Sequence, residues 1–204
     1  LTINNDTGEI RVKSGNYLVN ADLVIPPNYK FIVEAGTKLD IIQSANILSY
    51  SPVHFGGTKK EPISILSSDS TGQGITVINA GGQSIISYVE FKGLGNPKKA
   101  GLNQTGAINF YQSDVKITNI NIENNFGEDA LNIIRSYYEI YNSTFRDILS
   151  DAFDGDFSDG LIFNSVFYNC GNDAIDVSGS NVIIDSVFID NAGDKAISIG
   201  EKSI

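Results

Sequence analysis

Asp129-Ala130-Leu131-Asn132 recurs as Asp151-Ala152-Phe153-Asp154, then as Asp173-Ala174-Ile175-Asp176 and as Lys195-Ala196-Ile197-Ser198. The copies begin at positions 129, 151, 173 and 195, so the interval between them is constant. Gly106-Ala107-Ile108-Asn109 comes before these copies, and its distance from Asp129 is one residue longer than the constant interval. A short fixed period is typical of a solenoid, in which every repeat forms one coil and packs on its neighbours.

Each unit holds two short apolar runs that are separated by polar or glycine-containing bends. Runs rich in Ile, Val, Phe and Tyr that end at Gly, Asn, Asp or Ser are typical of β-strands. A helix is the competing interpretation for residues 131–141, where Leu131, Ile134, Tyr138 and Tyr141 share a helical face. The aligned residues 153–160 include Gly155 and several Asp and Ser residues, which form helices poorly. Since repeats share one conformation, strands are favoured.

The period and the strands together predict an all-β, single-stranded parallel β-helix with coils of about 22 residues. We expect it to be right-handed, by analogy with parallel crossover connections. Residues one period apart then form columns along the solenoid. Three columns are predicted to face inward: Leu131, Phe153, Ile175 and Ile197; Ile133, Val177 and Ile199; Phe145, Phe167 and Phe188. The neighbouring positions are predicted to face outward: Ala130, Ala152, Ala174 and Ala196; Asn109, Asn132, Asp154, Asp176 and Ser198.

A further column stands at a bend, where Asn119, Asn142, Asn164 and Asp185 are aligned. We interpret it as an asparagine ladder, in which each amide bonds to the next coil. Such bonds satisfy polar groups that would cost roughly 1–3 kcal/mol each if they were buried alone.

The 204 residues are enough for one domain, 1–204. Residues 1–73 lack the regular register and are interpreted as irregular first coils with a cap. Residues 74–204 are interpreted as regular coils. Because the chain begins at Leu1 and stops part of the way through a coil, we expect it to belong to a longer parent protein whose coils and other domains continue.

Charge and cysteine content limit the classes of partner. The net charge is −10, so nucleic acid is a poor partner. One cysteine, Cys170, excludes an internal disulfide framework, and one histidine, His54, excludes a multi-histidine metal site. No long apolar run of the kind that crosses a bilayer exists, so no membrane span is expected.

The acidic residues of the repeat predict a Ca²⁺ site. Asp154 and Asp156 are two positions apart on one strand, so both side chains point to the same side. Asp176 stands one coil away from Asp154 and Asn132 one coil away on the other side, and no Lys or Arg lies in these columns. Ca²⁺ prefers such carboxylate and amide oxygens. A solvated acidic face with screened repulsion is the alternative.

The Asn column and the phrases Asp173-Ala174-Ile175-Asp176 and Gly193-Asp194-Lys195-Ala196-Ile197-Ser198-Ile199-Gly200-Glu201 resemble the right-handed parallel β-helix, or pectate-lyase-like, superfamily over residues 74–204. More narrowly, these phrases and residues 25–63 resemble β-helix domains of large bacterial surface proteins, some of which accompany spore-coat-protein-H kinase-like modules. The resemblance implies an extracellular or cell-surface protein that handles polysaccharide, often with Ca²⁺.

The catalytic signatures of that superfamily do not carry over to this chain. The Gly-His-Gly and Arg-Ile-Lys segments of polygalacturonase-like enzymes are absent, and no histidine joins Tyr137, Tyr138 and the aspartates as in alginate-epimerase-like enzymes. Arg135 is the nearby candidate for the Arg base of pectate-lyase-like enzymes, but its register sets it against Phe157. No catalytic residue is therefore assigned.

Two functional classes stay open. In the first, the chain is a non-catalytic, carbohydrate-binding or spacer module of a secreted or surface protein. In the second, it is a polysaccharide lyase, epimerase or hydrolase that uses the acidic strip.

Overall fold

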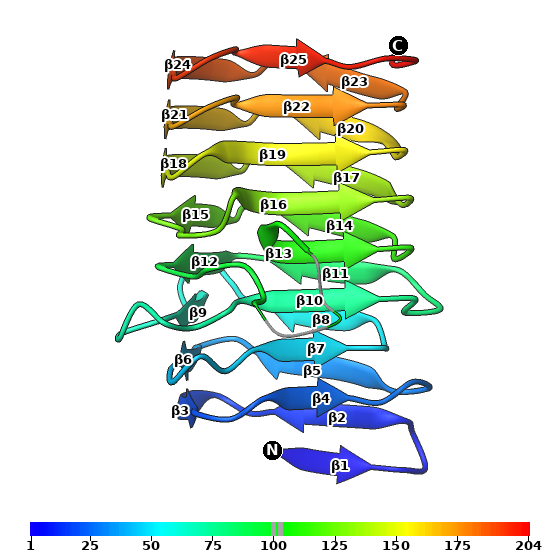
Figure 1. Cartoon of the computed structure of the whole chain (residues 1–204). Helices are drawn as coiled ribbons and strands as arrows, with labels where there is room; N and C mark the ends of the chain where they lie inside the picture. Colours follow the sequence, from blue (N-terminus) through cyan, green and yellow to red (C-terminus); the bar gives the residue numbers. More distant parts are fainter. Residues whose placement is uncertain (99–100, 102–103) are drawn as a thin grey trace.

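The computed structural model describes residues 1–98, 101 and 104–204, and these form a parallel β-solenoid (Figure 1). Successive coils stack along one axis, with the N-terminus at one end of the stack and the C-terminus at the other. The described residues contain no helix. The predicted all-β class and parallel coil are confirmed, and the handedness of the coil stays a prediction.

Every complete coil adds one strand to each of three sheets, which we name A, B and C. Sheet A contains β1 (Thr2–Asn4), β2 (Glu9–Val12), β5 (Lys30–Glu34), β8 (Val53–Gly56), β11 (Ser84–Ser87), β14 (Val115–Thr118), β17 (Tyr137–Tyr141), β20 (Asp159–Phe163) and β23 (Val182–Asp185). Sheet B contains β3 (Gly15–Val19), β6 (Thr37–Ile41), β9 (Ile63–Leu66), β12 (Val89–Lys92), β15 (Asn121–Glu123), β18 (Thr144–Ile148), β21 (Val166–Cys170) and β24 (Phe188–Ala192). Sheet C contains β4 (Leu23–Ile25), β7 (Ile47–Ser49), β10 (Ile75–Ile78), β13 (Gly106–Tyr111), β16 (Asp129–Ile134), β19 (Asp151–Asp156), β22 (Ile175–Ser178) and β25 (Ile197–Ile199).

The strand interpretation of residues 131–141 is confirmed, because β16 and β17 cover them apart from the bend between the two strands. Among the described residues the paired strands run parallel except at the first pair, in which β1 runs antiparallel to β2. This reversal places β1 over the N-terminal end of sheet A (Figure 1).

The length of the coils changes along sheet A. Phe31 pairs with Val53 in a coil of ordinary length. Phe55 pairs with Ile86 and Ile86 with Ile117, so these two coils are clearly longer. From Ile117 onward the pairing returns to the short coils of the repeat. The extra residues lie in the connections, so all coils build the same three sheets.

The aliphatic columns of sheet C face inward as predicted up to β22. Ile197 and Ile199 of β25 continue them in register but are 37% and 68% exposed. Leu131, Phe153 and Ile175 are paired in sequence and fully buried. Ile133 and Val177 are also buried, and Gly155 stands between them in the register. Gly155 leaves room for the Phe153 ring, which would lie 3.0 Å from a Cβ added there, and the Tyr138 hydroxyl of sheet A would lie 3.5 Å away. The core is thus filled across the coil as well as along it.

The alanine column faces the core, which corrects the predicted outward orientation. Ala130, Ala152 and Ala174 have no exposed surface and belong to the hydrophobic core. Ala174 lies in the bend immediately before β22. Strict alternation of faces holds only along a regular strand. Where the chain turns a corner, two successive side chains point inward.

The aromatic column contains two of its three predicted members. Phe145 and Phe167 are buried, with ring centroids 4.7 Å apart and planes at 8°. Phe167 pairs with Ile189 in the next coil, whereas Phe188 pairs with Val166 and is 54% exposed. The placement of Phe188 was therefore wrong by one position. The strands pair at the constant interval, which places Ile189 beside Phe167. Phe188 is one residue before that position.

The same error of one position affects the last member of the asparagine column. Asn119, Asn142 and Asn164 follow paired strand ends, whereas Asp185 pairs with Phe163. The column continues at Ser186, and all four of its residues have φ between 48° and 55°. Asn164 Nδ2 donates to Asn142 Oδ1 at 2.6 Å, so ladder bonding is present. Asn142 and Asn164 are exposed, so tolerance of positive φ accounts for asparagine better than burial does.

Serine residues supply the buried polar columns instead. The backbone N–H groups of Ser113, Ser136, Ser158 and Ser180 each donate to the Oγ of the serine one coil further on, at 2.9–3.3 Å. These four serines are buried, and each of their hydroxyls donates to a carbonyl two residues back in its own coil. The hydroxyl thus gives the corner N–H group a partner that the strands cannot provide.

The register correction provides a test of the core. Phe167→Ala should lower the free energy of unfolding by about 3–5 kcal/mol, because it removes a buried ring and leaves a cavity. Phe188→Ala, the matched control, should change it by less than about 1 kcal/mol, because this ring is more than half exposed. Urea unfolding followed by circular dichroism measures both variants. Equal losses for the two phenylalanines would contradict the assigned register.

Candidate functional site

A polar column runs along the outer face of sheet C, as the repeat predicted. Asn109, Asn132, Asp154, Asp176 and Ser198 are paired in order from β13 to β25. The structure therefore brings three of the predicted site residues, Asn132, Asp154 and Asp176, into one column. The fourth, Asp156, faces the same side in the next column, where it pairs with Ile134 and Ser178.

The described parts of the long connection from β12 to β13 lie in front of β10 and β13, in the middle of sheet C (Figure 1). Asn109 and Asn132 are only 0% and 1% exposed, whereas Asp154 and Asp176 are half-buried. The connection is held by two backbone bonds, from Gly95 N–H to the Gly72 carbonyl and from Phe126 N–H to the Leu94 carbonyl. Residues 99, 100, 102 and 103 of this connection lie outside the described residues.

Asp129 is the site residue that sequence reasoning missed. One coil further on, the Asp151 carboxylate caps the backbone of the next coil, since its Oδ1 accepts from Asp173 N–H at 2.7 Å. Asp173 repeats this contact with Lys195 N–H at 2.7 Å. Asp129 departs from the pattern, because the Asp151 N–H group bonds to the Glu128 carbonyl. Its carboxyl group instead bonds to Asn132 and to the Thr105 side chain.

The amide of Asn132 joins two carboxyl groups. Its Nδ2 donates to Asp154 Oδ2 at 2.7 Å and to Asp129 Oδ2 at 3.2 Å. Its Oδ1 is buried and makes no hydrogen bond to any described residue. We call Asp129, Asn132 and Asp154 the acidic cluster. An amide oxygen without a partner in a buried polar cluster is the kind of group for which a ligand or an ordered water is expected.

Burial and mutual repulsion disfavour the charged forms of these carboxyl groups. Burial raises the pKa of Asp129 to about 7, and the Asp151 and Glu128 charges add to the rise while the Thr105 hydrogen bond opposes it. Burial likewise raises the pKa of Asp154 to about 8, with repulsion from Asp129, Asp156 and Asp176. The pKa of Asp156 is also raised, first by burial and then by Asp176.

Positive side chains do not neutralise the acidic cluster within the described part of the chain. Lys195 Nζ lies 3.8 Å from Asp173 Oδ2, two coils away from Asp129. Arg135 donates from Nη1 to the Tyr111 hydroxyl at 3.0 Å, and its backbone stands in register with Phe157 as expected. Among the described residues, the acidic cluster therefore has no cationic partner.

Ca²⁺ binding at this face stays a prediction. Within residues 1–98, 101 and 104–204, no group of three or more His, Cys, Asp or Glu side chains is arranged to hold a metal ion. Ca²⁺ also accepts amide oxygens and water, and the Asn132 Oδ1 atom is a buried oxygen without a partner. A 180° rotation of the Asn132 amide group would exchange the positions of Oδ1 and Nδ2. Oδ1 would then lie between the Asp129 and Asp154 carboxyl groups.

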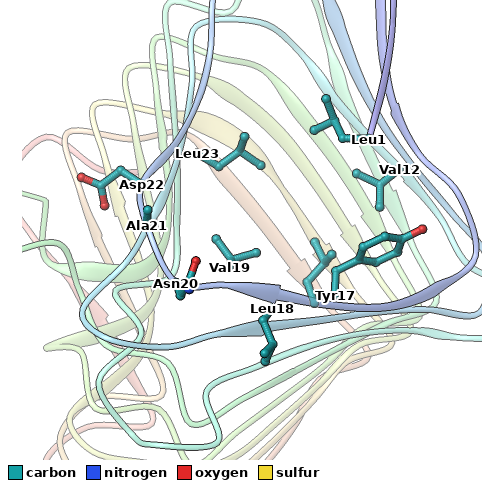
Figure 2. A pocket seen from close by; sticks show the side chains of 10 residues that line it. Leu1, Val12, Tyr17, Leu18, Val19, Asn20, Ala21, Asp22 and Leu23 are labelled. Atoms are coloured by element: carbon teal, nitrogen blue, oxygen red, sulfur yellow. The ribbon is translucent and has the colours of Figure 1, made fainter.

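Two other features lie outside this face. His54 is half-buried on β8, next to Arg11 and Glu34, and burial lowers its pKa. A cavity of about 240 Å³ lies at the first coil, where Leu1, Val12, Tyr17 and Val19 surround it (Figure 2). Its lining is mostly apolar, which is what an incompletely filled end of the core presents. Neither feature joins the predicted site residues.

Comparison with known proteins gives a weak structural likeness. No protein-family model and no curated protein matches the chain. A solved structure of the Streptococcus pneumoniae surface protein and adhesin PfbA aligns with 95% of this chain and 92% of that chain, at 9% sequence identity and a TM-score of 0.24. At this TM-score the likeness says nothing about function. No helix among the described residues is long and apolar enough to cross a membrane.

The raised pKa values of Asp129 and Asp154 predict a pH dependence of stability. Between the ordinary Asp pKa near 3.8 and about pH 8, the folded protein binds protons that the unfolded chain releases. The contribution of the Asp129 and Asp154 carboxyl groups to the free energy of unfolding is therefore fully present below about pH 4, and it is lost as pH rises toward 8. The slope is at most about 1.4 kcal/mol per pH unit for each carboxyl group.

Urea unfolding at several pH values between 5 and 8 measures this effect. Asp129→Asn and Asp154→Asn should each flatten the decline relative to the parent protein. Asp190→Asn, which alters an exposed carboxylate of sheet B, serves as the control and should leave the slope unchanged. Identical slopes for all four proteins would contradict the burial of charge at the cluster.

Proposed function

We propose that the chain is a non-catalytic β-solenoid module of a secreted or cell-surface protein, which binds a carbohydrate on the outer face of sheet C. The observation that carries this proposal is the acidic cluster, where a buried amide oxygen lacks a partner beside two carboxyl groups that no described cation neutralises. Buried polar groups are normally satisfied, so such a cluster is a place where a ligand contributes the missing interactions.

We further propose Ca²⁺ as the ion that links this face to its ligand. Asn132, Asp154 and Asp176 would provide oxygens from three successive coils, with Asp156 beside them and Asp129 as an added ligand. The positive charge of the ion would offset the repulsion among the carboxylates of this face. The chain's own residues hold these oxygens in place, because each belongs to a strand that pairs with both neighbours.

An ion-bridged face suits a carbohydrate that carries carboxylates. The protein's net charge of −10 repels an acidic glycan in the absence of cations, and a bound cation reverses the local sign. The same charge makes nucleic acid an unsuitable partner. The resemblance to pectate-lyase-like β-helices and to bacterial surface proteins supports an extracellular or cell-surface location and further domains in a parent chain, where the stiff stack would also act as a spacer.

The second candidate function is a polysaccharide-active enzyme, either a lyase, an epimerase or a hydrolase. It is favoured by the pKa values of about 7 and about 8 at Asp129 and Asp154, which suit general acid–base catalysis near neutral pH. Against it, no histidine or arginine is aimed at the cluster among the described residues. We retain the non-catalytic function because this catalytic partner is missing.

Calcium should stabilise the folded protein. At a Ca²⁺ concentration about 100 times the Kd, mass action adds about 2.7 kcal/mol to the free energy of unfolding and raises the Tm. Asp154→Asn with Asp176→Asn should remove this response, and without metal the double variant should be no less stable than the parent. Calorimetric titration and thermal melts in Ca²⁺ and in EDTA measure both effects.

The control for this experiment is Asp185→Asn with Asp190→Asn, which removes the same number of carboxyl groups from exposed positions on sheets A and B. It should keep the full Ca²⁺ response. If the parent protein binds no Ca²⁺ at millimolar Ca²⁺ concentration, the proposed Ca²⁺ site is refuted.

An activity assay separates the two candidate functions. Polygalacturonate, alginate and neutral polysaccharides are incubated with the protein, and unsaturated products, C5 epimers and new reducing ends are measured. A non-catalytic module retards polysaccharide migration in affinity gels and leaves each polymer intact. Turnover that Asp129→Asn or Asp154→Asn abolishes would replace the proposed function by the enzymatic one.

A further inference from the structure

A second polar hollow lies away from the acidic face, at the corner between sheets A and B. It has a volume of about 210 Å³. Its floor consists of Tyr88, Asn119 and Asn142, which occupy the same corner position in three successive coils. The connection from β8 to β9 forms one wall through Thr58, Lys59 and Pro62, and Glu90 and Asn121 line the sheet B side. We call this hollow the corner groove.

The corner groove presents amides that have no partner within the described protein. The side chains of Asn119 and Asn121 are half-exposed and make no hydrogen bond to another described residue. Asn142 uses its Oδ1 to accept from Asn164, which leaves its Nδ2 facing solvent. Each side-chain amide offers both donors and acceptors, which is the capacity needed to bind vicinal hydroxyl groups.

An aromatic ring stands at the head of this column of amides. Tyr88 adopts φ of 49°, a conformation that asparagine tolerates and a bulky residue disfavours. Its carbonyl accepts from the Ile63 N–H group, so the backbone there is fixed by the wall of the groove. Asparagine would continue the ladder without this strain, and strained residues are concentrated at functional sites. Tyr88 lines the groove, and a tyrosine ring has a flat apolar face on which the C–H face of a sugar ring can stack.

Charge selects the type of ligand. Lys59 and Glu90 are the charged residues that line the groove, and their charges cancel. The groove therefore lacks the positive charge that a uronate chain requires, and amides beside an aromatic ring suit hydroxyl groups. We infer that the corner groove binds a neutral oligosaccharide, which stacks on Tyr88 and bonds to Asn119 and Asn142. This inference rests on the proposed function only in taking the ligand to be a carbohydrate, since it uses a different face and needs no cation.

The test is a titration of the ¹⁵N-labelled protein, observed by NMR, with cellohexaose, xylohexaose, mannohexaose and chitohexaose in the presence of EDTA. We expect at least one of them to shift the side-chain amide signals of Asn119 and Asn142 and the backbone amide of Tyr88. Trigalacturonate in EDTA should leave these signals unchanged. No shift in the groove with any of the four neutral probes at ten millimolar would overturn the inference, and so would a larger shift with trigalacturonate.

Tyr88→Asn is the informative variant, because it extends the ladder while it removes the ring. Its urea midpoint should be no lower than that of the parent, and its affinity for the neutral probe should fall at least about 10-fold. Tyr137→Ala removes another tyrosine of sheet A, 43% exposed and outside the groove, and should retain the parent affinity. Equal affinity of parent and Tyr88→Asn would refute the site. Asp154→Asn with Asp176→Asn should bind the neutral probe normally, so failure of the Ca²⁺ site and failure of the groove are distinguishable.

Discussion

Hydrogen bonding between successive coils is the constraint on which the whole structure depends. Each strand pairs with the equivalent strand one coil before and one coil after, so a residue type at one position acquires neighbours at the same position of the adjacent coils. A buried apolar side chain must therefore fit its own column, as Phe145 and Phe167 do with parallel rings. A polar side chain finds its partner either in its own column, as Asn164 does with Asn142, or in its own coil, as Asn132 does with Asp129.

Two kinds of polar column show how burial decides the chemistry. The buried corners use serine, whose small hydroxyl accepts from the N–H group of the serine one coil before and donates to a carbonyl of its own coil. The exposed corners use asparagine, which tolerates positive φ and reaches its neighbour through the amide. The acidic cluster belongs to neither kind, since the buried Asp129 carboxyl group and the half-buried Asp154 carboxyl group are held by one amide. It is one of the places among the described residues where a buried polar atom has no hydrogen-bond partner, as the Asn125 Oδ1 atom and the Tyr138 hydroxyl also have none.

The repeat alone predicted the fold class, the inward columns of sheet C and the alignment of Asn132, Asp154 and Asp176. Those features depend only on period and alternation, which are visible in the chain. Phe188 and Asp185 were misplaced because a similar residue comes one position too early in their coil, and only backbone pairing reveals so small a shift. Asp129 was missed because its role depends on the β12–β13 connection, and no periodic signal describes how a non-repeating segment lies over a sheet.

The unequal coil lengths in sheet A bear on how this architecture changes during evolution. The longer coils that join Phe55, Ile86 and Ile117 leave the pairing intact, because the added residues project from corners. One residue added inside a strand would instead exchange its inner and outer faces. Loss or duplication of a whole coil preserves the phase of every column. Viable length variants should therefore differ by corner loops of any size or by complete coils, and the face that a ligand sees would survive both kinds of change.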